Sequence, residues 1–402
     1  MSGPNSDTGS IRAIDGSSIH RITSGQVVID LQTAVKELVE NSLDAGATSI
    51  DVRFKNYGLK SIEVLDNGSG ISENDFDSIG RKHHTSKLSA FHDLTTLTSF
   101  GFRGEALSSL CALCEDVTVT TATTDKAPMG AVLELDRRGE VKSKAKGVRQ
   151  HGTTILLTSL FSPLPVRRKE LERNIKREFG KALALLNAYT LGPCCGLGSG
   201  KAVRFSVANQ PDKGYVVTHI SLPLPSPAGS SLSLQTVRAG TTALWGPKAL
   251  NGVIDLDLEF EVPKKGKGKY RVEEDVDLVE DTFKIHVKGL ISSPTPIPGS
   301  GSTPSSGSSA RSATDRQFFY VNGRPCSLNK IQKAINDIYR TFIPSNATSN
   351  QFPFIVADFT IPGDAVDVNV TPDKRTILVH AEVELCGRIK VRISPLSRSF
   401  DA

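Results

Sequence analysis

Two polar side chains that could do chemistry lie four residues apart in the sequence, Glu37 and Asn41. Apolar residues recur around them at helical spacing, which predicts a helix over Val27–Leu43. Residues four apart on a helix share one face, one turn apart. A carboxylate placed there can act as a general base toward water, and an amide oxygen can bind a hard cation. Taken alone, the pair favours an exposed polar stripe with no catalytic role.

A second motif, Asp66-Asn67-Gly68-Ser69-Gly70, follows a predicted strand over Ser61–Leu65. Glycine permits a close backbone approach and positive φ, so Gly68 and Gly70 suit a turn that lies against a ligand. At the strand end, the Asp66 carboxylate could accept a hydrogen bond from the exocyclic amine of a buried base. The same residues also make a favourable surface turn.

The third motif is rich in glycine and runs into a predicted helix over Glu105–Leu113. Its residues are Gly101, Phe102, Arg103, Gly104, Glu105, Ala106 and Leu107. Backbone N–H groups at a helix N-terminus favour anions, so a triphosphate is a natural occupant. Upstream, the hydroxyl and ammonium groups of Thr85, Ser86 and Lys87 could also contact phosphate. The spacing is not that of a Walker loop.

The elements that must position these motifs fall into two groups, and 402 residues favour two domains. The expected strands of the first domain are 49–54, 61–65, 117–121, 131–135 and 153–158, with a long helix at 169–189. Proline, serine and glycine cluster near Pro223–Ser231, which indicates a domain boundary. The second domain is expected to hold strands at 253–262, 284–291, 316–322 and 354–360, and a helix at 329–339.

Composition and charge narrow the classes of protein. Hydrophobic residues make up 38% and charged residues 23%, as in soluble globular proteins, and no run approaches the roughly 18 apolar residues of a membrane helix. The first residues are polar and do not form a secretory signal. Six cysteines in this length indicate a reducing compartment rather than a disulfide scaffold. Arg137–Lys181 holds thirteen basic and four acidic residues, compatible with a nucleic-acid surface or a solvated face.

In this order, the motifs resemble those of the GHKL ATPases, the superfamily that gyrase, the ninety-kilodalton heat-shock chaperones, sensor histidine kinases and MutL share. The parts that carry the resemblance are Asn41, the turn at 66–70, the glycines from Gly101 to Gly104, and Gly152-Thr153-Thr154. Closer still, Lys36–Ala47 and Gly101–Leu107 match the signatures of the MutL mismatch-repair family without a gap.

Three further segments support the resemblance to MutL. Val366–Lys374 matches a third signature of the family, and Thr314–Tyr320 and Ser24–Val28 resemble its eukaryotic postmeiotic-segregation branch. The resemblance covers about Ile11 to Leu378 and implies an α+β fold: a GHKL-type α/β sandwich ATPase domain followed by a ribosomal-protein S5-like α/β transducer domain. The expected ranges are 1–10 for a disordered N-terminus, 11–228 for the ATPase domain, 229–380 for the transducer with a mobile loop at 292–312, and 381–402 for a divergent tail.

The resemblance also implies roles for residues and two cofactors, ATP and Mg²⁺. Glu37 would activate water, Asn41 would bind Mg²⁺, and Lys374 would reach the terminal phosphate from the second domain. Asp66 would bind the adenine amine, supported by Thr153 or Thr154. The stretch from Thr85 to Leu107, with Ser86, Lys87 and the glycine motif, would close over the phosphates. The expected activity is slow ATP hydrolysis.

Partners follow from the same resemblance: DNA, a second MutL homologue as heterodimer partner, and MutS-type mismatch-recognition proteins, in the nucleus and with no membrane. The candidate DNA contacts are basic residues of two helices and one turn, with a solvated basic helix as the alternative: Arg324, Lys330, Lys333, Arg167, Arg168, Lys169, Lys176 and Arg177. We expect no nuclease activity, because no endonuclease motif is found in the sequence. The alternatives are an interaction module that binds ATP without hydrolysing it, or a chaperone or topoisomerase ATPase.

Overall fold

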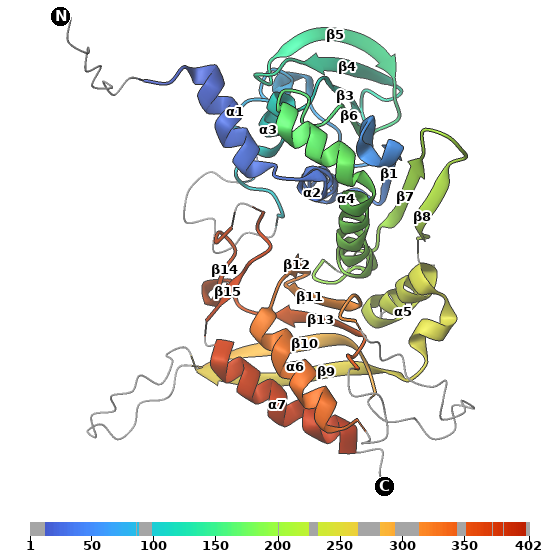
Figure 1. Ribbon diagram of the computed structural model, residues 1–402, viewed down its shortest axis with the longest axis vertical. Helices are drawn as coiled ribbons and strands as arrows, with labels where there is room; N and C mark the ends of the chain where they lie inside the picture. The colour runs from blue at the N-terminus through green and yellow to red at the C-terminus, as the bar shows by residue number, and fades with distance from the viewer. Residues whose placement is uncertain are drawn as a thin grey trace, which may run out of the picture.

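The computed structural model describes residues 13–85, 87, 99–199, 201–224, 232–263, 282–293, 313–343, 351–371, 373–380 and 382–398. The N-terminus predicted to be disordered, Ser86, and the predicted mobile loop beyond Ser293 lie outside these residues. The described elements form two layered units, each with its own β-sheet (Figure 1).

The first unit is built on an eight-stranded sheet with the order β5-β4-β3-β6-β2-β1-β7-β8. Its strands are β1 (Ser49–Lys55), β2 (Ser61–Asp66), β3 (Val117–Ala122), β4 (Met129–Leu135), β5 (Val141–Val148), β6 (Gly152–Thr158), β7 (Arg204–Gln210) and β8 (Val217–Leu222). Neighbouring strands are antiparallel except β1 and β7, which pair in parallel. Along β1, Ile50, Val52 and Phe54 are buried and the residues between them are not, because side chains alternate between the faces of a strand.

Helices α2 (Leu31–Asp44), α3 (Ala106–Leu113) and α4 (Pro165–Leu191) cover one face of this sheet, and α1 (Gly16–Val27) packs against α3 (Figure 1). The helix α2 begins where the Asp30 carboxylate caps the backbone N–H of Thr33, at 2.7 Å. Its apolar residues Leu31, Val35 and Leu38 are buried in the core, and α2 packs against α4. The cap and the core contacts fix the rotation of α2 and hence the direction of its remaining faces.

The second unit holds a five-stranded sheet with the order β12-β11-β13-β10-β9 and a short ladder of β14 and β15. The strands are β9 (Val253–Pro263), β10 (Thr282–Ser292), β11 (Gln317–Val321), β12 (Arg324–Cys326), β13 (Ile355–Thr360), β14 (Val366–Asp367) and β15 (Leu378–Val379). Two helices, α6 (Asn329–Thr341) and α7 (Glu382–Arg398), lie together on one side of the sheet, and α5 (Leu232–Trp245) lies between the two units (Figure 1).

Strand β11 is buried on both faces and joins the two cores. Phe318 and Tyr320 belong to the core of the first unit, whereas Phe319 and Val321 belong to the core beneath α6 and α7. The hydroxyl of Tyr320 donates to the carbonyl of Ala188 in α4 at 2.7 Å. Because apolar side chains of the second sheet continue the first core, the two units are packed against each other directly.

The sequence predicted most central elements to within a few residues, and the structure adds others. The helices and strands without a sequence prediction are α1, β5, β7, β8, α5, β12, β14, β15 and α7. Helix α7 places Leu385 and Ile389 in the second core, so the packed unit continues past residue 380, where the sequence prediction placed its end. Within the described part of the chain, no helix is both long and apolar enough to cross a membrane.

Candidate active site

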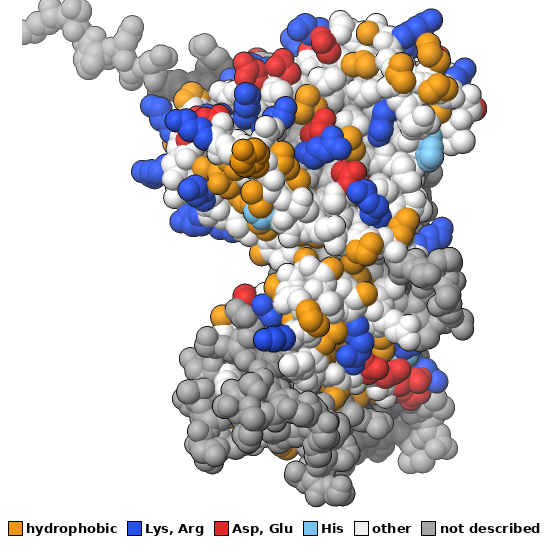
Figure 2. Space-filling model, turned by 90° about the vertical axis from the view of Figure 1, so that its right-hand side faces the viewer, with side chains coloured by type: hydrophobic (Ala, Val, Ile, Leu, Met, Phe, Trp, Pro, Cys, Tyr) orange, Lys and Arg blue, Asp and Glu red, His pale blue; other side chains and the backbone are white. Residues whose placement is uncertain are grey.

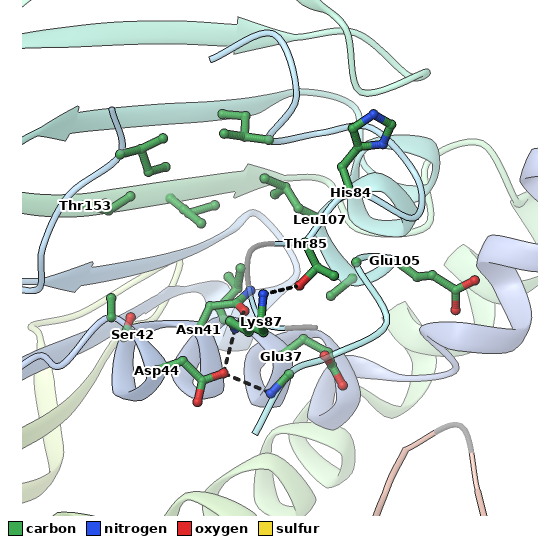
Figure 3. Close-up of a pocket in the computed structure, with 18 of the residues that line it drawn as sticks. Glu37, Asn41, Ser42, Asp44, His84, Thr85, Lys87, Glu105, Leu107 and Thr153 are labelled. Carbon is green, nitrogen blue, oxygen red and sulfur yellow. Dashed lines mark hydrogen bonds and ion pairs between the residues drawn. The ribbon is translucent and has the colours of Figure 1, made fainter. Parts of the chain in front are cut away.

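A cavity of about 730 Å³ opens between α2, the turn after β2, the glycine-rich stretch before α3, and the loop that carries Lys374. Figure 3 shows Glu37, Asn41 and Asp44 of α2 at its base, beneath the segment with Thr85 and Lys87. The cavity is thus lined by residues that are far apart in the sequence and belong to both units.

One face of α2 supplies the charged part of the cavity. Glu37, Asn41 and Asp44 follow one another at intervals of four and three residues, so they share one face of the helix. Asp44 was not among the residues singled out from the sequence, although this spacing could have identified it. Its carboxylate accepts hydrogen bonds from the N–H groups of Phe100 (2.7 Å) and Gly101 (2.9 Å). Asp44 therefore ties the glycine-rich stretch to α2.

Glu37 is buried and is held between two ammonium groups. Its Oε1 lies 3.0 Å from Lys36 Nζ and its Oε2 lies 3.8 Å from Lys374 Nζ. Burial opposes ionisation of the Glu37 carboxyl, but the attraction of Lys36 and Lys374 outweighs it and lowers the pKa of Glu37. The side chain is thus an ionised carboxylate that borders the cavity, as a group that accepts a proton from water must be.

Lys374 reaches the cavity from the second unit. Its backbone adopts a positive φ of 55°, and its side chain is only 4% exposed. Its Nζ donates to the carbonyl of Phe100 at 3.3 Å and lies 4.9 Å from the centre of the Phe102 ring. Burial lowers the pKa of Lys374 even though Glu37 and Glu40 attract its charge.

Asp66, at the end of β2, lies beside Ser42 and Thr153, and Figure 3 shows these two residues on the other side of the cavity from Glu37. Its carboxylate accepts hydrogen bonds from Ser42 Oγ (2.9 Å), Gly68 N (2.9 Å) and Thr153 N (3.1 Å). Burial raises the pKa of Asp66 despite these donors. The three donors fix the carboxylate in one orientation, so it can recognise a polar edge presented by a ligand.

Glycine is required in the turn beside Asp66. Gly70 has a φ of 73°, and a Cβ there would lie 2.2 Å from the carbonyl oxygen of Ala122. On the same side of the cavity, Thr153 is buried and its hydroxyl lies 3.0 Å from that of Thr121. Thr153 lines the cavity, whereas Thr154 and Gly68 do not. Of the two threonines that the sequence left open, the structure places Thr153 next to Asp66.

Lys87 closes the charged end of the cavity from above. Its Nζ donates to Asn41 Oδ1 (3.1 Å) and to Asp44 Oδ2 (2.6 Å), and Figure 3 shows Lys87 next to both residues. The Lys87 ammonium thus contacts the amide oxygen of Asn41, which the sequence analysis assigned to Mg²⁺. The surroundings of Asn41 Oδ1 favour positive charge.

The glycine-rich stretch forms the rim above α2. A Cβ at Gly101 would lie 2.9 Å from Lys87 Nζ. Gly104 has a φ of 62°, and a Cβ there would lie 2.5 Å from the carbonyl oxygen of His84. Arg103, predicted to contact the nucleotide, lines the cavity but donates to Asn369 Oδ1 in the second unit at 2.6 Å. The stretch therefore contacts α2 below and the second unit beside it.

The structure corrects one DNA-contact prediction. Arg324 is buried, and its guanidinium donates to the carbonyls of Phe100 (3.1 Å) and Ser99 (2.7 Å). It also stacks over the Phe100 ring at 5.1 Å. A basic residue after a glycine turn was expected at the surface, but the packing of the two units encloses it. Arg324 thus holds the base of the glycine-rich stretch and is not placed to contact DNA.

The other basic candidates lie at or near the surface. Arg168 is half-buried and donates to the carbonyls of Leu59 and Leu160. Six are exposed: Arg167, Lys169, Lys176, Arg177, Lys330 and Lys333. Lys330 pairs with Glu382 of α7 at 2.6 Å. Figure 2 shows Lys and Arg side chains scattered among hydrophobic and acidic ones over the upper part of one face.

The cavity brings together most of the residues that the sequence singled out for nucleotide binding. These are Glu37, Asn41, Asp66, Gly70, Thr85, Lys87, Gly101, Phe102, Arg103, Gly104, Glu105, Ala106, Leu107, Thr153 and Lys374. Ser86 lies outside the described residues. Among the described residues, no cluster of three or more His, Cys, Asp or Glu side chains could hold a metal ion.

Comparison with known proteins identifies the class of this site. Residues 29–152 match the family described as histidine kinase-, DNA gyrase B-, and HSP90-like ATPase. That range contains Glu37, Asn41, Asp66 and the glycine-rich stretch. Residues 267–396 match the family described as DNA mismatch repair protein, C-terminal domain. The first unit is thus a GHKL-type ATPase domain, and the second carries a mismatch-repair signature.

Similar proteins extend this match to nearly the whole chain. Mismatch repair endonuclease PMS2 of Gallus gallus is 41% identical over 95% of this chain, and DNA mismatch repair protein PMS1 of Saccharomyces cerevisiae is 39% identical over 96%. This chain covers 40% of the length of each. A crystal structure of the N-terminal domain of a DNA repair protein is 36% identical, with a TM-score of 0.75, over 95% of this chain and 98% of that one. The chain belongs to the MutL/PMS family of DNA mismatch-repair proteins.

Proposed function

We propose that the cavity binds ATP with Mg²⁺ and hydrolyses it slowly. The observation that carries this proposal is the ionised, buried Glu37 carboxylate at the edge of a cavity that has a fixed carboxylate at one end and ammonium groups at the other. The adenine base of the nucleotide would lie at Asp66, whose carboxylate oxygens are oriented by hydrogen bonds from Ser42, Gly68 and Thr153. The phosphates would extend toward Lys87 and Lys374.

The residues present fit a magnesium ion at Asn41. In this structure the Lys87 ammonium stands in for a cation at Asn41 Oδ1, and the carboxylate of Asp44 lies beside it. Mg²⁺ prefers oxygen ligands and keeps several waters or phosphate oxygens, so one amide oxygen is a sufficient protein ligand. When bound, the ion would neutralise charge on the phosphates.

Each remaining group has a role that follows from its position. Glu37 Oε2 accepts a proton from the attacking water, while Lys374 offers positive charge to the terminal phosphate. Backbone N–H groups from Phe102 to Leu107, at the start of α3, would bind the phosphates. Turnover is slow in this proposal, because several of these groups depend on the placement of the glycine-rich stretch against α2.

Nucleotide binding would also change the association state of the protein. Lys374, Arg324 and Arg103 connect the second unit to the glycine-rich stretch, so a ligand that binds this stretch would favour one arrangement of the units. We propose that ATP closes the stretch from Thr85 to Leu107 and favours dimerisation with a second MutL homologue around DNA, in concert with MutS-type proteins. The names of the similar proteins support action in DNA repair, and because several of these proteins are eukaryotic, we propose that the protein acts in the nucleus.

Two alternatives use the same cavity. An interaction module would bind ATP without turnover, and a chaperone or topoisomerase subunit would couple turnover to another partner. The buried Glu37 disfavours the first, and the mismatch-repair match of residues 267–396 disfavours the second. We propose no nuclease activity for this chain, although some of its relatives are named endonucleases.

Release of phosphate from ATP in the presence of Mg²⁺ tests the proposal. The wild-type chain is expected to turn over, and Glu37→Ala to lose roughly 10²- to 10⁴-fold in kcat while it still binds ATP. Asn41→Ala is expected to lose Mg²⁺-dependent ATP binding itself. Glu73→Ala, an exposed glutamate outside the cavity, is the matched control and should behave as wild type. Equal turnover in wild type and Glu37→Ala would remove Glu37 from the reaction.

A further inference from the structure

A set of buried charges lies behind Glu37, among residues that do not line the cavity. Lys36 Nζ donates to Glu37 Oε1 at 3.0 Å and to Glu40 Oε2 at 2.8 Å. Lys36 and Glu40 are 2% and 1% exposed. Burial opposes the charge on Lys36, but Glu40 and Glu37 outweigh it and raise the pKa of the Lys36 ammonium. Lys36 therefore stays charged and links the two carboxylates.

Tyr189 of α4 completes this set from a different helix. Its hydroxyl donates to Glu40 Oε1 at 2.6 Å, and the side chain is fully buried. Burial and the charge of Glu40 raise the pKa of Tyr189 well above its ordinary value, so the phenol remains a donor. Both oxygens of Glu40 are thus engaged, one by Tyr189 and the other by Lys36.

The consequence for Glu37 is geometric. Its Oε1 is held by Lys36 from behind, and its Oε2 lies toward Lys374 at the cavity. A carboxylate with one oxygen fixed presents the other in a single orientation. Displacement of a reacting group by about 1 Å can cost roughly a hundredfold in rate, so such a fixed orientation matters for a base.

The stability of the fold gives no sufficient reason for this arrangement. Lys36, Glu37, Glu40 and Lys374 are all buried, and the removal of four ions from water is costly. Apolar residues of similar volume are often as stable as a buried ion pair or more so. The chain nevertheless places two positive and two negative groups in alternation, with each acid bonded to or facing a base.

We propose that Tyr189, Glu40 and Lys36 form a positioning chain that orients Glu37 for proton transfer from water. The proposal rests on the proposed function of Glu37 as the base. The positioning chain does not touch the nucleotide, so its loss lowers kcat and leaves binding of ATP nearly unchanged. Its anchor lies in α4, the helix that also receives the Tyr320 hydroxyl at Ala188.

Two matched tyrosine variants of the full chain test this inference. Tyr189→Phe removes the hydroxyl that holds Glu40. The control Tyr320→Phe removes an equally buried hydroxyl that donates to the backbone of α4 and not to Glu40. We expect Tyr189→Phe to lower kcat roughly tenfold with the KM for ATP within about twofold, and Tyr320→Phe to leave both within about twofold. Thermal unfolding of both variants reports any general loss of stability.

Further variants keep the test decisive. Lys36→Met should lower kcat more than Tyr189→Phe does, and Lys36→Arg should restore part of the loss because it can still donate to both carboxylates. If Tyr189→Phe unfolds at the assay temperature, Glu40→Gln carries the same test and is expected to lower kcat with little change in KM. Equal kcat values in the position-189 and position-320 variants, or in wild type and Glu40→Gln, would overturn the positioning chain. If those kcat values are equal and Glu37→Ala is inactive, only the positioning chain is wrong and the proposed function is retained. If Glu37→Ala is active, the proposed function itself is wrong.

Discussion

The two ends of the cavity are built in different ways. At the end formed by Asp66, every donor to the carboxylate comes from the first unit: Ser42, Gly68 and Thr153. At the end formed by Glu37 and Lys87, the cavity draws on α2, on the glycine-rich stretch and on Lys374 of the second unit. The first end is complete within one unit, whereas the second is complete only when the two units are packed together. A ligand that spans both ends therefore reports on the arrangement of the units.

The largest effect is expected at the end shared by the two units. Lys374→Met should lower kcat roughly a hundredfold or more, because it removes the charge that faces the terminal phosphate and leaves Glu37 without one of its two ammonium neighbours. Steady-state turnover with Mg²⁺ and ATP measures the change. Lys333→Met, which alters an exposed lysine of the same unit, is the control. A Lys374→Met variant with the turnover of the control would show that the second unit contributes nothing to the reaction.

The next effect separates the two ends. Asp66→Asn should raise the KM for ATP about 10- to 100-fold with kcat nearly unchanged, because it alters hydrogen bonds made by a buried carboxylate far from Glu37. Asp51→Asn is a matched control, since Asp51 lies on the neighbouring strand β1 and pairs with Arg204. The contrast between the ends would fail if Asp66→Asn reduced kcat as strongly as Lys374→Met.

A smaller effect concerns the contact that fastens the two units together. Arg324→Met leaves the carbonyl of Ser99 without its donor and the carbonyl of Phe100 with Lys374 Nζ alone, so the free energy of unfolding should fall by about 1 to 3 kcal/mol. Denaturant unfolding measures this loss, with Arg53→Met as an exposed control. The burial of Arg324 also predicts an unchanged salt dependence of DNA binding in the folded variant. A slope reduced by about 1 would instead indicate a phosphate contact.

The smallest expected effect is a shift in the acid limb of the pH profile of turnover. The pKa of Glu37 is lowered from its ordinary value of 4.5, so the carboxylate stays ionised above that value and turnover should fall only when the pH drops below it. The lowered pKa also affects stability. At pH values above the pKa of Glu37 in the unfolded chain, the ionised carboxylate stabilises the fold, and this stabilisation is lost as the pH falls through the lower pKa of Glu37 in the folded state. In Lys374→Met the acid limb of kcat/KM should move upward, because one cause of the lowered pKa is removed. An acid limb at the same pH in both proteins would contradict the pairing.

The difference between the two ends also explains what the sequence could predict. The face of α2 with Glu37 and Asn41, and the turn at Asp66, are local patterns, and periodicity with turn chemistry was enough to find them. Asp44 continues the same face and could have been found by its spacing. Helix α7 extends the second unit beyond residue 380 through packing that no local pattern announces.

Other features depend on contacts between distant segments. Arg324 follows a glycine in a segment that the sequence alone would place in a surface turn. Only the packing of the two units against each other shows that its side chain is buried. Glu40 lies three residues after Glu37 and is tilted off the face that Glu37 and Asn41 share, so helical spacing gives it no role. The structure retains that tilt and reveals its partner, Tyr189, 149 residues away. A pairing at such a separation leaves no trace in the periodicity of a single sequence.

The most direct test of the account is the structure of this chain crystallised with Mg²⁺ and a non-hydrolysable ATP analogue. The account predicts an adenine amine against Asp66, a magnesium ion at Asn41 Oδ1 in the place that Lys87 Nζ now occupies, and a terminal phosphate within hydrogen-bond distance of Lys374 Nζ. A nucleotide bound outside this cavity, or one whose terminal phosphate contacts only the first unit, would contradict it.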